Sequence, residues 1–154
     1  RLFIQTDSNY GRANVNFKTT KREVKKYFKD THDLWICPGF IAANSEKETT
    51  TLGRGGSDYT ASIIAAALKS EKLEIWTDVS GMMTADPRIV RSAYAIENIS
   101  YEEAMELSHF GAKVLYPPTI QPALEAKIPI HIKNTFESDH SGTIIAKKSS
   151  KRND

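Results

Sequence analysis

Residues 49–60 read TTTLGRGGSDYT and lead directly into the apolar run 61–68, and this stretch constrains the fold more than any other. Glycine lets a backbone turn tightly and approach a ligand, because no Cβ stands in the way. A helix that begins here presents unpaired N–H groups and the positive end of its dipole, which favour anions. Arg54 can bind a carboxylate or phosphate through two parallel hydrogen bonds, and Asp58 adds an acidic group. The stretch predicts an anion-binding loop; a glycine-rich connection without a ligand is the alternative.

Composition and charge describe an ordinary globular chain. Its 154 residues suffice for one domain with a core, and 40% are hydrophobic and 26% charged. The formal net charge of +2 gives no reason to expect nucleic acid as a partner. No apolar run approaches membrane-spanning length and no signal peptide opens the chain, so we expect no membrane partner.

The single cysteine and the chain ends carry two further expectations. Cys37 cannot form an internal disulfide, which favours a reducing compartment, and we expect a cytoplasmic protein with Cys37 buried in a strand. Residues 147–154 are basic and lack periodicity, so we interpret them as a linker or tail. Both ends suggest a piece of a longer protein.

Helix and strand patterns alternate along the chain, which predicts an α/β fold with a mainly parallel sheet and flanking helices. Helices are predicted at 21–29, 57–69, 101–109 and 120–126, and strands at 34–37, 73–77, 129–133 and 143–146. Ser57 is expected to cap its helix, and Ser100 with Glu103 has the form of a capping box. Strand 34–37, the glycine loop, its helix and strand 73–77 would form a βαβ unit with parallel pairing. Ligands are then expected at the carboxyl ends of the strands.

Several common site types are missing from the sequence. The Walker pattern GxxxxGK[ST] does not occur, and the dinucleotide pattern fails because the glycine spacing ends at Asp58. Neither a GxSxG elbow nor a spacing of His and Cys typical of metal sites is present. Hydrolase and metalloenzyme functions therefore have little support.

Three more segments carry groups suited to phosphate. Residues 76–79 end a predicted strand, Arg88 follows an Asp-Pro turn, and Lys113 follows a glycine near a predicted helix. Arg88 and Lys113, each taken alone, are more typical of solvated surface cations. Together with the glycine loop they favour a phosphate-binding site.

These segments carry a resemblance to a known family. Residues 49–60, 76–88 and 110–115 resemble the signature segments of aspartate kinases, within the amino acid kinase family. Residues 100–108 and 132–135 are similar especially to the kinase part of bifunctional aspartate kinase–homoserine dehydrogenases. The resemblance covers nearly the whole chain. It implies that residues 1–146 are the C-terminal, nucleotide-binding portion of the kinase catalytic domain, within an αβα sandwich.

The resemblance also implies a reaction. Aspartate kinases transfer the γ-phosphoryl group of ATP, with Mg²⁺, to the side-chain carboxylate of L-aspartate, the first step of lysine, threonine and methionine biosynthesis. Because a carboxylate with a pKa of about 3.9 is already ionised at neutral pH, no general base is required. Catalysis would then depend on positioning and on cationic stabilisation of the transferred group.

Matching positions imply the following roles. Asp58 and Lys113 are the expected catalytic residues, Asp58 by organising the catalytic lysines and Lys113 near the phosphates. The expected substrate-binding residues are Arg54, Ser57 and Phe40. The expected nucleotide-binding residues are Thr77, Asp78, Met83, Arg88, Lys113 and Val114. Met83 stands where many relatives carry a tyrosine, and no residue of this chain is assigned as a metal ligand because Mg²⁺ would bridge the phosphates.

Other family segments lie outside this chain. The N-terminal segment with a catalytic lysine, the acidic aspartate-binding residue and the regulatory ACT domains are missing. We therefore expect the chain to be catalytically inactive by itself, and the parent protein to be a homo-oligomer. Another amino acid kinase, or a non-catalytic binding or dimerisation module, is the alternative.

Overall fold

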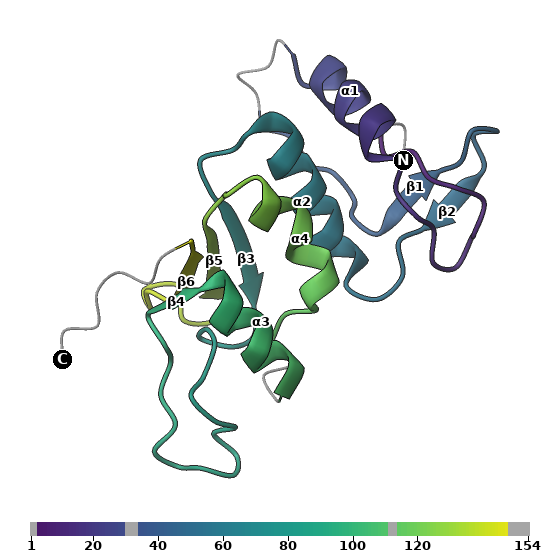
Figure 1. The fold of residues 1–154 in the computed structure, drawn as a ribbon. Coiled ribbons are helices and arrows are strands. Elements are labelled where there is room, and N and C mark those ends of the chain that lie inside the picture. The colour runs from purple at the N-terminus through teal and green to yellow at the C-terminus, as the bar shows by residue number, and fades with distance from the viewer. Residues whose placement is uncertain (1–2, 30–33, 111–113, 148–154) are drawn as a thin grey trace.

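The computed structural model describes residues 3–29, 34–110 and 114–147 (Figure 1). Its helices are α1 (Phe17–Tyr27), α2 (Gly56–Leu68), α3 (Tyr101–Phe110) and α4 (Pro117–Glu125). Its strands are β1 (Ile41–Ala43), β2 (Thr49–Thr51), β3 (Leu73–Thr77), β4 (Asn98–Ser100), β5 (Ile130–Asn134) and β6 (Thr143–Ala146). None of the described helices is long and apolar enough to cross a membrane.

The larger sheet has four strands in the order β3-β5-β6-β4. β3 pairs with β5, and β4 with β6, in parallel, whereas β5 and β6 are antiparallel. Along β5, alternate side chains are buried, as expected for a strand with one face on the core. The predicted mainly parallel sheet with flanking helices is confirmed, and the three-residue strand β4 is an addition to it.

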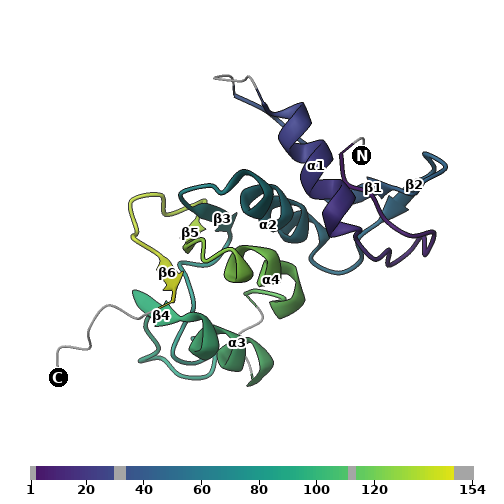
Figure 2. The same cartoon turned by 45° about the horizontal axis from the view of Figure 1, so that its top comes forward.

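Helix α2 joins two hydrophobic clusters. Ala67 belongs to a cluster with Phe3, Ile4 and Val24, whereas Ala65 belongs to the larger cluster that covers the sheet. Figures 1 and 2 show α1 and the β1–β2 hairpin at one end of the molecule, the four-stranded sheet and α3 at the other, and α2 between them. Helix α2 therefore lies where these two parts of the molecule meet.

The predicted strand at 34–37 is wrong. These residues form no strand, and Leu34 and Ile36 are each 92% exposed. Trp35 packs edge-on against Tyr27 and Phe28, with ring centroids 5.5 and 5.4 Å apart, and Cys37 is only half-buried. The apolar pattern is that of a strand, but a strand needs a neighbouring backbone, and no described strand pairs with it.

The predicted βαβ unit is therefore wrong as well. The strand before α2 is β2, which pairs with β1 in a separate antiparallel hairpin. In β2, Thr50 is fully buried and its hydroxyl lies 2.7 Å from that of Thr6. The parallel partner of β3 comes later in the chain, as β5.

Most remaining elements are confirmed, with shifted ends at three helices. α1 begins before the predicted residue 21, because the Asn16 side chain caps it by accepting a hydrogen bond from the Thr19 N–H at 3.1 Å. α4 begins at Pro117, since proline suits the first position of a helix. α2 begins at Gly56 with Gly55 as its N-cap, so the prediction of Ser57 as the cap is wrong. Strands 73–77, 129–133 and 143–146 are found within one residue of prediction.

The capping box at the start of α3 is confirmed. The Ser100 Oγ accepts a hydrogen bond from the Glu103 N–H at 3.1 Å, and a Glu103 carboxylate oxygen accepts one from the Ser100 N–H at 2.9 Å. Ser100 is also the last residue of β4, so this reciprocal pair turns the chain directly from strand to helix.

Candidate functional site

The glycine loop before α2 packs against the beginning of α4. Gly53 and Gly55 have φ angles of 75° and 68°, and the Gly56 N–H donates to the Gly53 carbonyl at 3.0 Å. A Cβ on Gly55 would lie 2.7 Å from Thr119 Cγ2 and 3.3 Å from Tyr116 Cβ. Glycine at position 55 thus permits both the left-handed backbone and the close approach of the two helices.

Two helix N-termini consequently meet at this loop. Figure 1 shows α2 and α4 side by side, both beginning toward the side where β3 ends. The Arg54 side chain lies over Tyr116, the residue that precedes α4, with the guanidinium carbon 5.4 Å from the ring centroid. Two positive dipole ends and one exposed guanidinium form an environment that favours an anion.

Phe40 is held rigidly beside the same turn. Its φ angle is 74°, and its N–H donates to the Thr60 hydroxyl at 3.0 Å while its carbonyl accepts from the Leu52 N–H at 2.9 Å. A Cβ on Gly56 would lie 2.6 Å from the Phe40 ring. A bulky residue in left-handed backbone is strained, and such strain concentrates at functional sites.

Ser57 and Asp58 occupy the first turn of α2. Ser57 is exposed, and Gly39 packs so closely against it that a Cβ would lie 2.8 Å from Ser57 Cα. Asp58 is half-buried, and burial raises the pKa of its carboxyl. The structure therefore gathers Phe40 and residues 54–58 around one helix start.

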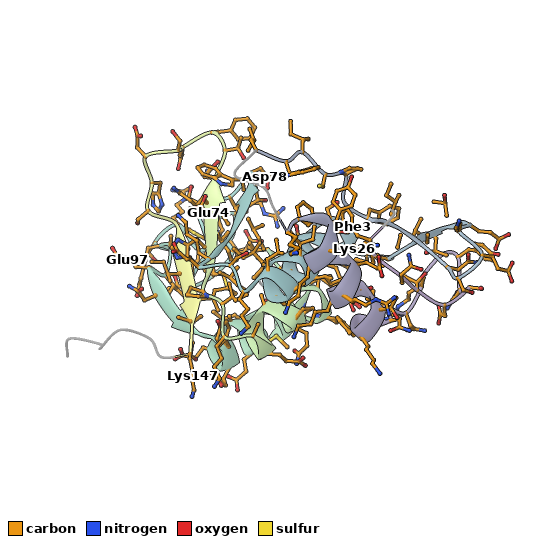
Figure 3. The ribbon with its side chains drawn as sticks, turned by 90° about the horizontal axis from the view of Figure 1, so that it is seen from above. Phe3, Lys26, Glu74, Asp78, Glu97 and Lys147 are labelled. Atoms are coloured by element: carbon orange, nitrogen blue, oxygen red, sulfur yellow. The ribbon has the colours of Figure 1, made fainter. Side chains whose placement is uncertain are left out.

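Thr77 and Asp78 lie where β3 ends. The Thr77 hydroxyl donates to the Asp78 carboxylate at 3.1 Å, and the Thr77 carbonyl accepts from the Thr135 N–H at 2.8 Å. In Figure 3, Asp78 lies beside the tip of the strand that also carries Glu74. Thr77 and Asp78 are at the carboxyl end of a parallel strand, as predicted.

The other predicted nucleotide-binding residues are more scattered. Met83 is half-buried in a bridge with Ala95. Arg88 is exposed, and its guanidinium binds the Asp86 carboxylate at 2.6 Å, which lowers the pKa of Asp86 to about 2. Val114 packs against the larger core cluster, and Lys113 lies outside the described residues.

Tyr116 and Thr119 belong to this site although no sequence pattern singles them out. The Pro-Pro pair at 117–118 is the available signal, because proline is common at the first helical position. It could have placed a helix start here, but not its contact with Gly55. Among the described residues, no three His, Cys, Asp or Glu side chains are grouped so that they could hold a metal ion.

Comparison with known proteins identifies the family of this chain. The amino acid kinase family matches residues 2–134. The bifunctional aspartokinase/homoserine dehydrogenase of Buchnera aphidicola is 44% identical over 151 residues, which are 98% of this chain and 18% of that protein. Lysine-sensitive aspartokinase 3 of Escherichia coli is 39% identical over 96% of this chain and 33% of that protein.

Solved structures show the same similarity in three dimensions. The crystal structure of E. coli aspartokinase III in complex with aspartate and ADP matches with a TM-score of 0.90 at 38% identity. The match covers 97% of this chain and 34% of that one, so the chain spans about a third of the length of that relative. The relatives named above are an aspartokinase and a bifunctional aspartokinase/homoserine dehydrogenase, and this chain belongs to the amino acid kinase family.

Proposed function

We propose that residues 1–146 are the C-terminal, nucleotide-binding portion of an aspartate kinase catalytic domain, followed by a linker or tail at 147–154. The intact protein would transfer the γ-phosphoryl group of ATP to the β-carboxylate of L-aspartate, the entry step to lysine, threonine and methionine. One observation carries this proposal: the N-termini of α2 and α4 meet at the glycine loop, through the contact of Gly55 with Thr119. The E. coli structure that matches this chain was solved with aspartate and ADP, which supports the proposal that the intact protein binds aspartate and an adenine nucleotide.

L-Aspartate is proposed to bind at the start of α2. Arg54, stacked on Tyr116, would bind the α-carboxylate of the substrate. Ser57 and Phe40 would seat the rest of it, since both are partly open to solvent beside the same turn. Asp58 would organise the lysines that stabilise the transferred group, one of which is Lys113.

MgATP is proposed to bind across the end of β3. The proposed contacts are Thr77, Asp78, Met83, Arg88, Lys113 and Val114. Mg²⁺ is usually held by phosphates, water and one or two carboxylates. A site that relies on the nucleotide phosphates for its metal therefore suits this chain.

The chain by itself is proposed to be catalytically inactive. It spans about a third of the E. coli aspartokinase, so the N-terminal kinase half and the ACT domains would be supplied by the rest of the parent protein, which we expect to be a homo-oligomer. Hydroxamate trapping of β-aspartyl phosphate, with the purified chain, MgATP and aspartate, checks this. Product formed by the chain itself would overturn the inactivity.

Calorimetric titration with MgADP tests the nucleotide site. We expect the parent chain to bind, Lys113→Ala to bind at least about tenfold more weakly, and Lys21→Ala, a control on α1, to match the parent. No binding by the parent, with circular dichroism showing a folded chain, would favour a non-catalytic module. Equal binding by all three proteins would remove Lys113 from the site.

A further inference from the structure

The connection from β3 to β4 contains a long excursion with a closed base. It leaves the sheet and returns to it, as Figure 1 shows. The Ile96 N–H donates to the Met82 carbonyl at 2.8 Å, Met83 forms a bridge with Ala95, and the Thr84 N–H donates to the Tyr94 carbonyl at 3.0 Å. We name residues 82–96 the 82–96 loop; its base is a short antiparallel pair of arms.

The hydroxyl of Thr143 bonds to both arms. Thr143 is the first residue of β6 and is fully buried. Its Oγ1 accepts a hydrogen bond from the Met82 N–H at 2.8 Å and donates one to the Ile96 carbonyl at 2.6 Å. One donor and one acceptor of the loop are thereby satisfied by the same side chain, which anchors both arms to the sheet.

Gly81 shows how closely the loop is held to this hydroxyl. Its φ angle is 123°, and a Cβ there would lie 2.4 Å from Thr143 Oγ1. Only glycine allows the chain to pass the hydroxyl at this distance in this conformation. The backbone at Gly81 is therefore in close contact with the Thr143 hydroxyl, and a larger residue at position 81 would not fit.

We propose that Thr143 is a positioning residue for the nucleotide, acting through the 82–96 loop. The loop carries Met83 and Arg88, so this inference rests on their proposed role in nucleotide binding. Arg88 lies on the exposed distal part of the loop, where local contacts such as its pair with Asp86 cannot anchor it to the sheet. The base of the 82–96 loop must therefore set the position of Arg88.

Thr143→Val removes the hydroxyl and keeps the shape of the side chain, whereas Thr143→Ser keeps the hydroxyl. Thr20→Val is a matched control: Thr20, on α1, is also fully buried, accepts from the Gln5 N–H at 3.0 Å and donates to the Gln5 carbonyl at 3.3 Å. Hydrogen–deuterium exchange of residues 84–94 reports on the loop, and titration with MgADP reports on the site.

We expect Thr143→Val to speed exchange of residues 84–94 and to weaken MgADP binding, each by roughly tenfold relative to Thr143→Ser, as loss of a buried hydrogen-bond pair implies. Thr20→Val should leave both unchanged. Equal exchange in Thr143→Val and Thr143→Ser would overturn the proposal, and so would faster exchange with unchanged MgADP affinity.

Two further results are also decisive. If Thr143→Val and Thr143→Ala both fail to fold while Thr143→Ser folds, Thr143 supports the whole core and the proposal is wrong. If the parent does not bind MgADP, the proposed function fails together with the nucleotide part of this inference. The exchange experiment then still decides whether Thr143 holds the loop.

Discussion

The Arg54 guanidinium lies over the ring of Tyr116, with its central carbon 5.4 Å from the ring centroid. The two residues are far apart in the sequence, and they belong to the starts of two different helices. The ring orients an exposed cation at a place where both helix dipoles favour an anion. The relationship makes Arg54 a pre-positioned group and not a freely moving surface arginine.

The first prediction concerns this stacking. Tyr116→Leu should shift the Arg54 side-chain proton resonances toward those of an unstructured arginine, because the ring current is lost, while Tyr116→Phe should leave them near the parent positions. The measurement is two-dimensional NMR of the folded chain. The loss in stability should be small, about 0.5–1 kcal/mol, as for other exposed cation–π contacts. Unchanged Arg54 resonances in the leucine variant would show that no stacking exists in solution.

The second prediction concerns the glycine loop. Gly55→Ala should lower the free energy of unfolding by about 2 kcal/mol, because it places a Cβ in left-handed backbone and 2.7 Å from Thr119 Cγ2. Urea denaturation measures the change. Gly11→Ala is the control, since a Cβ there meets nothing within 4 Å. Equal stability of the two variants would mean that α2 and α4 do not meet as closely as described.

The third prediction uses the pKa of Asp58, which burial raises. A raised pKa in the folded state means that folding favours the protonated carboxyl, so this stabilisation is present at acidic pH and is lost as pH rises through the folded-state pKa. Asp58→Asn should therefore be more stable than the parent at pH 7, with the difference shrinking at acidic pH. Urea denaturation at several pH values measures this.

Asp86→Asn serves as a comparison, because the pKa of Asp86 is shifted in the opposite direction from that of Asp58. The Arg88 hydrogen bonds lower the pKa of Asp86 to about 2, so its contribution is present at neutral pH and is lost only as pH falls toward that value. Lower stability of Asp58→Asn than of the parent at pH 7 would contradict the burial argument. Higher stability of Asp58→Asn than of the parent would indicate that Asp58 is retained for function and not for folding.

The fourth prediction concerns the contact of α2 with α4. The fully buried Ser62 hydroxyl accepts a hydrogen bond from the Ala123 N–H at 3.0 Å, next to Pro122 inside α4. Ser62→Ala should cost about 1–3 kcal/mol of unfolding free energy, because it leaves a buried N–H without a partner. Thermal or urea denaturation tests this, with the exposed Ser92→Ala as control. A loss no larger than that of the control would mean that the N–H finds another acceptor.

Local patterns predicted much of the fold. The capping box at Ser100, the strand at 73–77 and the final strand depend on neighbouring residues, so the sequence contains the signals for them. The segment 34–37 shows the limit of such patterns. Its apolar run is typical of a strand, but strand formation depends on a partner that no local pattern can supply.

The candidate site also has parts that the sequence predicts and parts that only the tertiary structure shows. The sequence by itself determined the glycine loop, the helix after it and the acidic group in its first turn, because turns and helix starts depend on a few consecutive residues. Only the tertiary structure decided that Gly55 meets Thr119, that Tyr116 orients Arg54 and that Thr143 anchors the 82–96 loop. These contacts join residues distant in the chain, and they form because helices and sheet must bury their apolar faces against one another.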